Sequence, residues 1–285
     1  MTDAVEKVPV SILVPIKNEA DNLPRSLGSV AWASEIIVVD SRSADGSPAI
    51  AESLGARVVQ FEFNGTWPKK KQWALDHLDF QNEWIFILDA DEVLPPEAEN
   101  EFRMIVNAAP VGVDGYWINR RFMFMGKWLK FSYYPNWNLR LVRRGKARFE
   151  KLTESETASG DNEVHEHILV EGETRNLVVE MDHYAFPDVA TFIEKHNRYS
   201  NWEAVVHLES AEQDPGLQKA EVSRRRGLKR LAARLPLRPL LRFLYVYIWQ
   251  KGFLDGKEGY YFARLHGVYE FLIVAKTAEL KKRSK

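Results

Sequence analysis

The stretch Trp84-Ile85-Phe86-Ile87-Leu88-Asp89-Ala90-Asp91-Glu92 decides the fold. Its first five residues are a continuous apolar run, which predicts a short strand buried on both faces. The strand leads directly into two carboxylates, Asp89 and Asp91, separated by one residue. Hard cations such as Mg²⁺ and Mn²⁺ prefer carboxylate oxygen. Such a pair can also be a solvated acidic turn, but its place at the end of a hydrophobic strand favours a metal site.

Three further short apolar runs precede this strand, and helical patterns separate them. The runs cover residues 10–14, 35–39 and 57–61. Three helices are predicted after them: one that ends near residue 30, one that ends near residue 54, and one over 67–78. Short apolar strands that alternate with helices indicate an α/β fold with a mostly parallel sheet flanked by helices. In such sheets, ligands bind beyond the carboxyl ends of the strands.

Polar side chains follow these strands at the edge where a ligand is expected. Asn18 and Glu19 come after the first strand, and Asp40 ends the second. A carboxylate at the position of Asp40 can accept a hydrogen bond from a base N–H or a ribose hydroxyl, or it can cap a turn. Glu19 can equally cap the helix that follows it.

Three consecutive lysines begin the helix predicted over residues 67–78. Lysine at a helix N-terminus can meet phosphate, because the helix dipole and the free backbone N–H groups also favour an anion there. A solvated charged turn is the alternative for Lys69 and Lys70. We select Lys71 as the candidate contact to a nucleotide.

Two pairs of neighbouring residues later in the chain, each with one acid and one histidine, are candidates for catalysis. Strands are predicted at 115–121 and 138–143, a polar loop at Thr153–Asn162, and another strand-like segment from Val164. Glu166, after His165, is a candidate general base that would take a proton from an acceptor hydroxyl. Asp182 is the rival base. His183 is a candidate metal or phosphate contact.

The composition sets the class of protein and an unusual charge distribution. The 285 residues are 45% hydrophobic and 28% charged, typical of a soluble globular chain, and the absence of cysteine excludes disulfides, thiolate catalysis and zinc–thiolate sites. The N-terminus lacks the pattern of a signal peptide. Residues 223–285 hold 16 Lys or Arg and 4 Asp or Glu, a surplus of 12 positive charges, whereas residues 1–222 carry a surplus of 13 negative charges.

A basic tail on an acidic body suggests that the tail meets a polyanion, either an anionic membrane surface, a nucleic acid or an acidic glycan. From Asp188 onward the pattern is helical, and residues 240–249 are basic and aromatic. The uncharged run within them is far shorter than the ~20 residues of a spanning helix. An interfacial amphipathic surface is therefore expected rather than a transmembrane helix.

Together these motifs resemble glycosyltransferase family 2. The resemblance is carried by three segments: Val14-Pro15-Ile16-Lys17-Asn18-Glu19, Ile37-Val38-Val39-Asp40-Ser41 with Asp45-Gly46-Ser47, and Leu88-Asp89-Ala90-Asp91-Glu92. A finer resemblance, to the bacterial branch that adds glucose to the inner core of lipopolysaccharide, is carried by Trp137-Asn138-Leu139-Arg140-Leu141, Val164-His165-Glu166 and Gly252-Phe253-Leu254-Asp255-Gly256-Lys257-Glu258-Gly259.

The resemblance implies a GT-A fold, a UDP-sugar donor, inversion at the anomeric carbon and a divalent metal, Mn²⁺ or Mg²⁺. It places Pro15 and Glu19 along the nucleoside, Asp40 at the base and Lys71 near the nucleotide. It assigns the metal–diphosphate to Asp91 and the role of general base to Glu166. One departure is that relatives often carry Arg followed by Asn or Gln after a glycine-rich turn, where this chain has Lys71-Gln72 after Trp67-Pro68.

We therefore predict a metal-dependent inverting glycosyltransferase, with a GT-A domain over residues 1–205 and a basic, aromatic helical extension over 206–285. The predicted partners are a nucleotide-sugar, a glycan or glycolipid acceptor such as the lipopolysaccharide core, and an anionic membrane surface. The predicted location is the cytoplasm, at the inner face of the cytoplasmic membrane. The alternatives are a sugar-nucleotide nucleotidyltransferase, which would want a glycine-rich loop after the first strand, and a non-catalytic binder of nucleic acid or glycan.

Overall fold

The structure is a computed structural model, and it describes residues 6–108, 110–151, 161, 167–209 and 237–283. Contacts divide these residues into two compact units. The first unit holds the described residues up to 123 together with those from 135 to 185, and the second holds 124–134 and the described residues from 186 onward. This division differs from the predicted boundary after residue 205, because the helix that begins at Val189 packs against the C-terminal helix.

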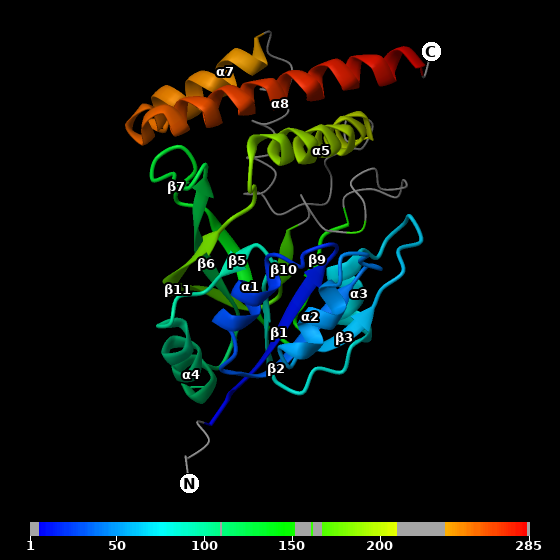
Figure 1. The fold of residues 1–285 in the computed structure, drawn as a ribbon, viewed down its shortest axis with the longest axis vertical. Coiled ribbons are helices and arrows are strands. Elements are labelled where there is room, and N and C mark those ends of the chain that lie inside the picture. The colour runs from blue at the N-terminus through cyan, green and yellow to red at the C-terminus, as the bar shows by residue number, and fades with distance from the viewer. Residues whose placement is uncertain (1–5, 109, 152–160, 162–166, 210–236, 284–285) are drawn as a thin grey trace. The chain divides into compact units, whose positions relative to one another are not determined.

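The first unit is built on a curled sheet with helices on both faces (Figure 1). Its strands are β1 (Val8–Ile16), β2 (Ala33–Asp40), β3 (Arg57–Gln60), β4 (Trp84–Ile87), β5 (Glu92–Val93), β6 (Val113–Phe124), β8 (Trp137–Arg143) and β11 (Glu173–His183). They lie in the order β3-β2-β1-β4-β8-β6-β11-β5. Strands β1 to β4 are parallel, whereas β8 runs antiparallel to both of its neighbours. A separate antiparallel pair is formed by β9 (Ala147–Phe149) and β10 (Ile168–Val170).

The apolar runs are buried because helices cover the sheet on both sides. The helices of this unit are α1 (Leu23–Ser29), α2 (Ser47–Ser53), α3 (Lys70–His77) and α4 (Ala98–Ala108). Val10, Ile12 and Val14 of β1 share one core with residues of α1, α2 and α4. Leu13 of the same strand faces the other core, with Ala74 of α3. The predicted mostly parallel α/β sheet flanked by helices is confirmed.

Strand β11 was not predicted, and it changes the geometry of the unit. Inward and outward side chains alternate only from Leu177 to Met181, where Leu177, Val179 and Met181 face the core and Val178 is exposed. The residues before and after this stretch are polar, so the period of two that signals a strand is short. Only four residues separate β4 from β5 along the chain, yet β8, β6 and β11 lie between them in the sheet. The sheet therefore curls, and the end of β11 returns to the segment that follows β4.

The second unit is mostly helical, as predicted from Asp188 onward. Its elements are β7 (Lys127–Trp128), α5 (Val189–Glu209), α7 (Arg238–Leu244), the π-helical turn η1 (Tyr245–Trp249), the 3-10 turn η2 (Gly252–Asp255) and α8 (Gly256–Arg283). Phe192 of α5 and Phe262 and His266 of α8 share a buried aromatic core. Within the described part of the chain, no helix is long and apolar enough to cross a membrane.

The glycine-rich segment at residues 252–259 is an anchor within the second unit. The buried Asp255 carboxylate accepts hydrogen bonds from the backbone N–H groups of Lys130, Phe131 and Ser132 at 2.9, 3.1 and 2.8 Å. A Cβ atom on Gly259 would lie 2.0 Å from the Gly252 carbonyl oxygen, so a side chain there cannot be accommodated. This motif, which the sequence suggested only by resemblance, closes the turn before α8 and holds residues 130–132.

Replacing Asp255 should destabilise the second unit. Asp255→Ala leaves three backbone N–H groups and the Ser132 hydroxyl without their acceptor. Leaving buried donors unpaired costs about 1–3 kcal/mol each in the worst case, so we expect a loss of roughly 3 kcal/mol in the free energy of unfolding, measured by urea denaturation. Asp255→Asn, which keeps one acceptor oxygen, should lose less. The exposed Glu279→Ala is the control, and an equal effect of Asp255→Ala and Glu279→Ala would contradict the assignment.

Candidate active site

The segment that follows β4 is organised by a carboxylate that the sequence analysis did not single out. Glu92 is completely buried. One of its oxygens accepts the backbone N–H of Asp89 at 2.9 Å, and the other meets Arg140 at 2.8 Å and Arg120 at 3.1 Å. Because a buried carboxylate is stable only when it is paired and hydrogen-bonded, these contacts fix the turn over residues 89–92.

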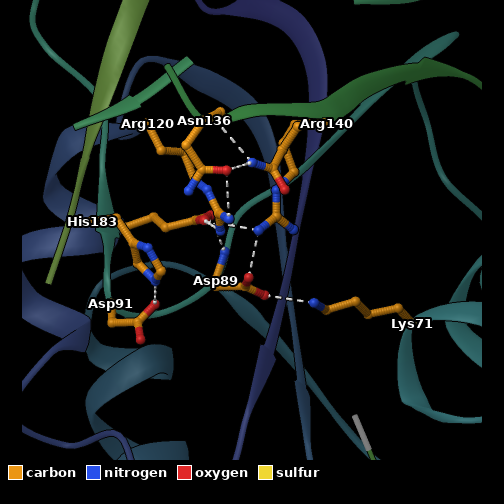
Figure 2. A network of polar contacts seen from close by, with 9 residues as sticks. Lys71, Asp89, Asp91, Arg120, Asn136, Arg140 and His183 are labelled. Atoms are coloured by element: carbon orange, nitrogen blue, oxygen red, sulfur yellow. Dashed lines mark hydrogen bonds and ion pairs between the residues drawn. The ribbon is translucent and has the colours of Figure 1, made fainter. Parts of the chain in front are cut away.

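Asp89 is held between two cations (Figure 2). Lys71 Nζ lies 2.8 Å from one carboxylate oxygen, and Arg140 Nη2 lies 2.5 Å from the other. Burial opposes ionisation of this carboxyl, but the Arg140 guanidinium and the Lys71 ammonium outweigh it and hold the pKa of Asp89 well below its usual range. Conversely, burial disfavours the charged guanidinium, yet Asp89 and Glu92 raise the pKa of Arg140. Asp89 is thus ionised and fixed in position.

A β-bulge aims Arg140 at this cluster. Leu139 of β8 pairs with Trp117 of β6, and Leu141 pairs with the preceding residue, Tyr116, so that Arg140 is an extra residue without a partner in the ladder. Leu139 and Leu141 then pack into opposite cores. Bulges often redirect a side chain beside a functional site, and here the bulge sends a charged side chain toward the end of β4.

Asp91 and His183 come together from two strands that are distant in sequence. His183 pairs with Glu92 in the β5–β11 ladder, and the Tyr184 N–H donates to the Asp91 carbonyl oxygen at 2.8 Å. This places His183 Nε2 3.4 Å from Asp91 Oδ1, as Figure 2 shows. The other ring nitrogen, Nδ1, is buried and has no hydrogen-bond partner among the described residues. The curl of the sheet therefore builds a pair of one carboxylate and one imidazole.

This pair fits a divalent cation that is shared with a ligand. A carboxylate oxygen and an imidazole nitrogen are suitable ligands for Mn²⁺, and both side chains are partly exposed. Among the described residues, no group of three or more His, Asp or Glu side chains is arranged to hold a metal. Since Asp89 already meets Lys71 and Arg140, the pair would need further ligands beyond the residues that the structure describes. Ions such as Mg²⁺ that bind substrate phosphates use this arrangement commonly.

The residues predicted along the nucleoside lie at the same edge of the sheet. Pro15 is in β1, and the register Ile16↔Asp40 aligns the ends of β1 and β2. The completely buried Asp40 carboxylate accepts Gln60 Nε2 at 3.0 Å and the Ser43 N–H at 3.1 Å.

Glu19 lies in the loop that follows β1. Its backbone N–H donates to Ser47 Oγ at 2.9 Å, and one carboxylate oxygen accepts Asn22 Nδ2 at 2.7 Å. The two loops are also joined by the bond from the Asn18 N–H to Ser43 Oγ at 2.7 Å. Side chains of both loops thus support a common rim beyond the ends of β1 and β2.

The three consecutive lysines at the start of α3, Lys69, Lys70 and Lys71, are buried rather than solvated. Lys70 Nζ donates to the Ile16 carbonyl oxygen at 2.6 Å and pairs with Asp161 at 3.0 Å. Burial lowers the pKa of Lys70, which Asp161 partly opposes. Lys70 is therefore structural and ties α3 to the end of β1, whereas Lys71 reaches Asp89.

The two candidate bases have different positions. Asp182 lies at the end of β11, where Arg121 Nε is 2.7 Å from its Oδ1 atom. Glu166 and its neighbour His165 lie outside the described residues. The predicted loop at Thr153–Asn162 lies outside them too, except for Asp161.

Sequence reasoning missed Glu92, Arg120 and Arg140 as members of the site. A signal was present for Arg140, because it interrupts the apolar run Leu139-Arg140-Leu141-Val142. A charged residue inside a buried strand requires a partner of opposite charge. The identity of that partner depends on which strand end it reaches, and the sequence does not contain that information.

The pKa of Asp89 generates a prediction about stability and pH. Because this pKa is lower in the folded protein than in the unfolded chain, Asp89 contributes stability above the ordinary aspartate pKa of about 3.9, and the contribution is lost as the pH falls through the folded-state value. Urea unfolding should show wild type more stable than Asp89→Asn by about 2 kcal/mol near neutral pH. The difference should shrink in acid. The exposed Asp79→Asn should show no such gap, and a gap for Asp89→Asn that stays constant with pH would contradict the assignment.

Comparisons with known proteins agree with this geometry. The model of the family described as "Glycosyl transferase family 2" matches residues 11–160. The "Lipopolysaccharide core biosynthesis glycosyltransferase LpsC" of Rhizobium meliloti is 29% identical over 283 residues, which cover 95% of this chain and 93% of the relative. The uncharacterised glycosyltransferase RT0209 of Rickettsia typhi is 27% identical, with 97% of this chain and 89% of the relative covered.

A solved structure shows the same fold. The mannosyltransferase PcManGT of Pyrobaculum calidifontis, in complex with GDP-Man and Mn²⁺, has a TM-score of 0.53 at 14% identity, covering 96% of this chain and 88% of that one. At this identity the likeness establishes the GT-A fold alone. The family model spans more than half of the chain, from β1 to beyond β9, and includes the acidic segment after β4. This protein therefore belongs to glycosyltransferase family 2.

Proposed function

We propose that this protein is a metal-dependent inverting glycosyltransferase that moves a hexose, glucose by its resemblance, from a UDP-sugar to a hydroxyl of a cell-envelope glycolipid such as the lipopolysaccharide core. The observation that carries the proposal is the pairing of Asp91 with His183 beside the fixed Lys71–Asp89–Arg140 cluster, at the carboxyl end of β4. Membership of the family supports transfer of a sugar. The name of the Rhizobium meliloti relative supports the class of acceptor.

In this proposal Asp91 and His183 hold the divalent cation. Bound Mn²⁺ or Mg²⁺, coordinated also by the donor diphosphate, would neutralise the negative charge that develops on the UDP leaving group. The complex of the Pyrobaculum calidifontis mannosyltransferase with GDP-Man and Mn²⁺ supports this pairing of nucleotide-sugar and metal. Asp89, which the sequence predicts as a metal ligand together with Asp91, contacts Lys71 and Arg140 instead and keeps both cations at the site.

The charge of the buried cluster suits an anionic ligand. Lys71, Arg120 and Arg140 supply three positive charges, and Asp89 and Glu92 supply two negative charges. Partly desolvated cations of fixed position attract a diphosphate more strongly than solvated ones do, because the effective dielectric constant is lower there. Lys71 is the member of this cluster that we assign to the nucleotide.

We assign the nucleoside to the rim beyond the ends of β1 and β2, where Pro15, Glu19 and Asp40 lie. The carboxylate of Asp40 is fixed by Ser43 and Gln60, so its acceptor atoms are presented in one orientation. A fixed acceptor favours a ligand N–H or hydroxyl of defined geometry. The chain lacks a glycine-rich loop after β1, which disfavours the nucleotidyltransferase alternative.

For the general base we propose Glu166 rather than Asp182. The proton of the acceptor hydroxyl must move to a carboxylate whose acceptor atoms are available. The ion pair between Arg121 Nε and Asp182 Oδ1, at 2.7 Å, favours a role for Asp182 in holding the end of β11 next to His183. The predicted cytoplasmic location, at the inner face of the cytoplasmic membrane, stays a prediction.

Metal-dependent nucleotide binding tests the donor site. UDP should bind to wild-type protein in the presence of Mn²⁺ and at least roughly tenfold more weakly in EDTA, measured by titration calorimetry. Asp91→Ala and His183→Ala should each lose the metal-dependent part of the affinity for UDP, since each variant removes one of the two protein ligands that retain the ion. The exposed Asp79→Asn should bind UDP as wild type does.

If folded wild-type protein bound UDP in neither condition, the assignment of the donor would fail. If Asp91→Ala kept the full effect of Mn²⁺, the metal would lie elsewhere. A circular dichroism spectrum and a thermal midpoint equal to those of wild type keep loss of binding distinct from loss of folding.

The choice of base makes a separate prediction. Glu166→Gln should lower the rate of sugar transfer by about 10²- to 10⁴-fold, the usual contribution of general base catalysis, while metal-dependent UDP binding stays intact. Asp182→Asn should lower it less. The rate is measured as UDP release in the presence of acceptor. A larger loss for Asp182→Asn, with UDP binding unchanged, would reverse the assignment.

A further inference from the structure

An apolar surface of the second unit lies on α7 and η1. Leu241, Leu244, Tyr245, Ile248 and Trp249 are all exposed, and they line one shallow apolar depression. Their spacing places them on one face of a helix, three or four residues apart. The opposite face is packed, since Val246 is 1% exposed, whereas Trp249 is 79% exposed.

The turn that follows also exposes apolar side chains. Phe253 and Leu254 of η2 are half exposed, although the backbone of this turn is held firmly by the Asp255 carboxylate. The fold therefore presents these apolar side chains on a fixed support. Single exposed apolar residues are common on soluble proteins, but a contiguous group of this kind marks a contact surface.

Positive charge accompanies the apolar side chains. Residues 237–283 contain nine Lys or Arg and four Asp or Glu. All four acids are engaged. Asp255 is buried, Glu270 pairs with Arg238 and Glu279 with Arg283, both at 2.6 Å, and Glu258 lies 3.5 Å from Lys127 and 4.0 Å from Lys257. Lys251 and Lys257, which flank the turn, are exposed. The exposed charged side chains at the two ends of the turn are thus cationic.

We propose that the face formed by Leu241, Leu244, Tyr245, Ile248, Trp249, Phe253 and Leu254 binds the interfacial region of an anionic lipid bilayer. Aromatic rings with a polar group, such as Tyr and Trp, prefer the level of the lipid headgroups. Aliphatic side chains beside them enter the boundary with the acyl chains, and neighbouring lysines attract anionic headgroups. The face lies flat on the bilayer and does not span it.

The distribution of charge favours lipid over a second copy of this chain. Pairing two copies through this face would bring two surfaces of the same positive sign together, which disfavours association. Nucleic acid would account for the lysines but not for the exposed Leu and Ile side chains, since its backbone is recognised by charge. An anionic bilayer satisfies both features.

Flotation of the full-length protein with vesicles tests this inference. Wild type should bind vesicles of phosphatidylcholine with phosphatidylglycerol and bind pure phosphatidylcholine weakly. The double variant Ile248→Ser with Trp249→Ser should lower the partition coefficient roughly tenfold or more, because it removes the apolar burial. Lys251→Gln with Lys257→Gln should weaken binding to the anionic vesicles by a smaller, salt-sensitive factor. Val178→Ser, at an exposed apolar position of β11, is the matched control and should bind as wild type does.

The inference fails if wild type does not float with the anionic vesicles, or if the Ile248/Trp249 double variant floats as well as wild type does. A wild-type dimer that the double variant makes monomeric, with no vesicle binding, would assign the face to a second copy instead. The result is separate from that of the proposed function. Metal-dependent UDP binding reports on the donor site, and all the surface variants should retain UDP binding.

Discussion

The candidate active site depends on the buried carboxylate of Glu92. A charge with no access to solvent must be compensated nearby, and Glu92 meets this requirement with two guanidinium groups and one backbone N–H. The backbone N–H is that of Asp89, so the compensation also sets the shape of the acidic turn. Arg140 then links Glu92 to the Asp89 side chain. Two carboxylates that would repel one another are thereby held three residues apart in a single turn.

The curled sheet explains how this turn acquires its remaining members. Strand β4 supplies the turn, β8 supplies Arg140 through its bulge, β6 supplies Arg120, and β11 supplies His183. Lys71 arrives from α3 on the other side. An open sheet of this length would leave β11 far from β4, whereas curling brings its last residues to Asp91. The site is therefore assembled from the strands beyond β4, which pair in mixed directions, as much as from the parallel strands β1 to β4.

The second unit contains a motif that resembles the family and whose residues support the fold. The glycine-rich segment at residues 252–259 has a structural role: its glycines allow close backbone approach, and the Asp255 carboxylate accepts the backbone N–H groups of residues 130–132. Its rigidity matters for the adjacent surface, because side chains such as Leu254 and Trp249 remain exposed on it. Stability and surface chemistry are thus provided by different residues of the same segment.

The sequence alone was enough to predict the α/β class, the strands β1 to β4 and the acidic turn at their carboxyl edge. Buried parallel strands are continuous apolar runs, and this signal is local. The sequence also identified four candidate site residues, which the structure brings together in two pairs, Lys71 with Asp89 and Asp91 with His183. The donor, the metal and the role of Glu166 stay predictions.

Only the tertiary structure determined the partners of those residues. Strand β11 has only a short alternating pattern, from Leu177 to Met181, and its place depends on pairing with β6, some sixty residues earlier in the chain. The bulge at Arg140 arises from the register between two strands, which neither strand encodes by itself. Local propensity determines whether a segment is a strand, but the contacts of a buried charge are settled by how the whole sheet closes, because only then are the distances between strand ends defined.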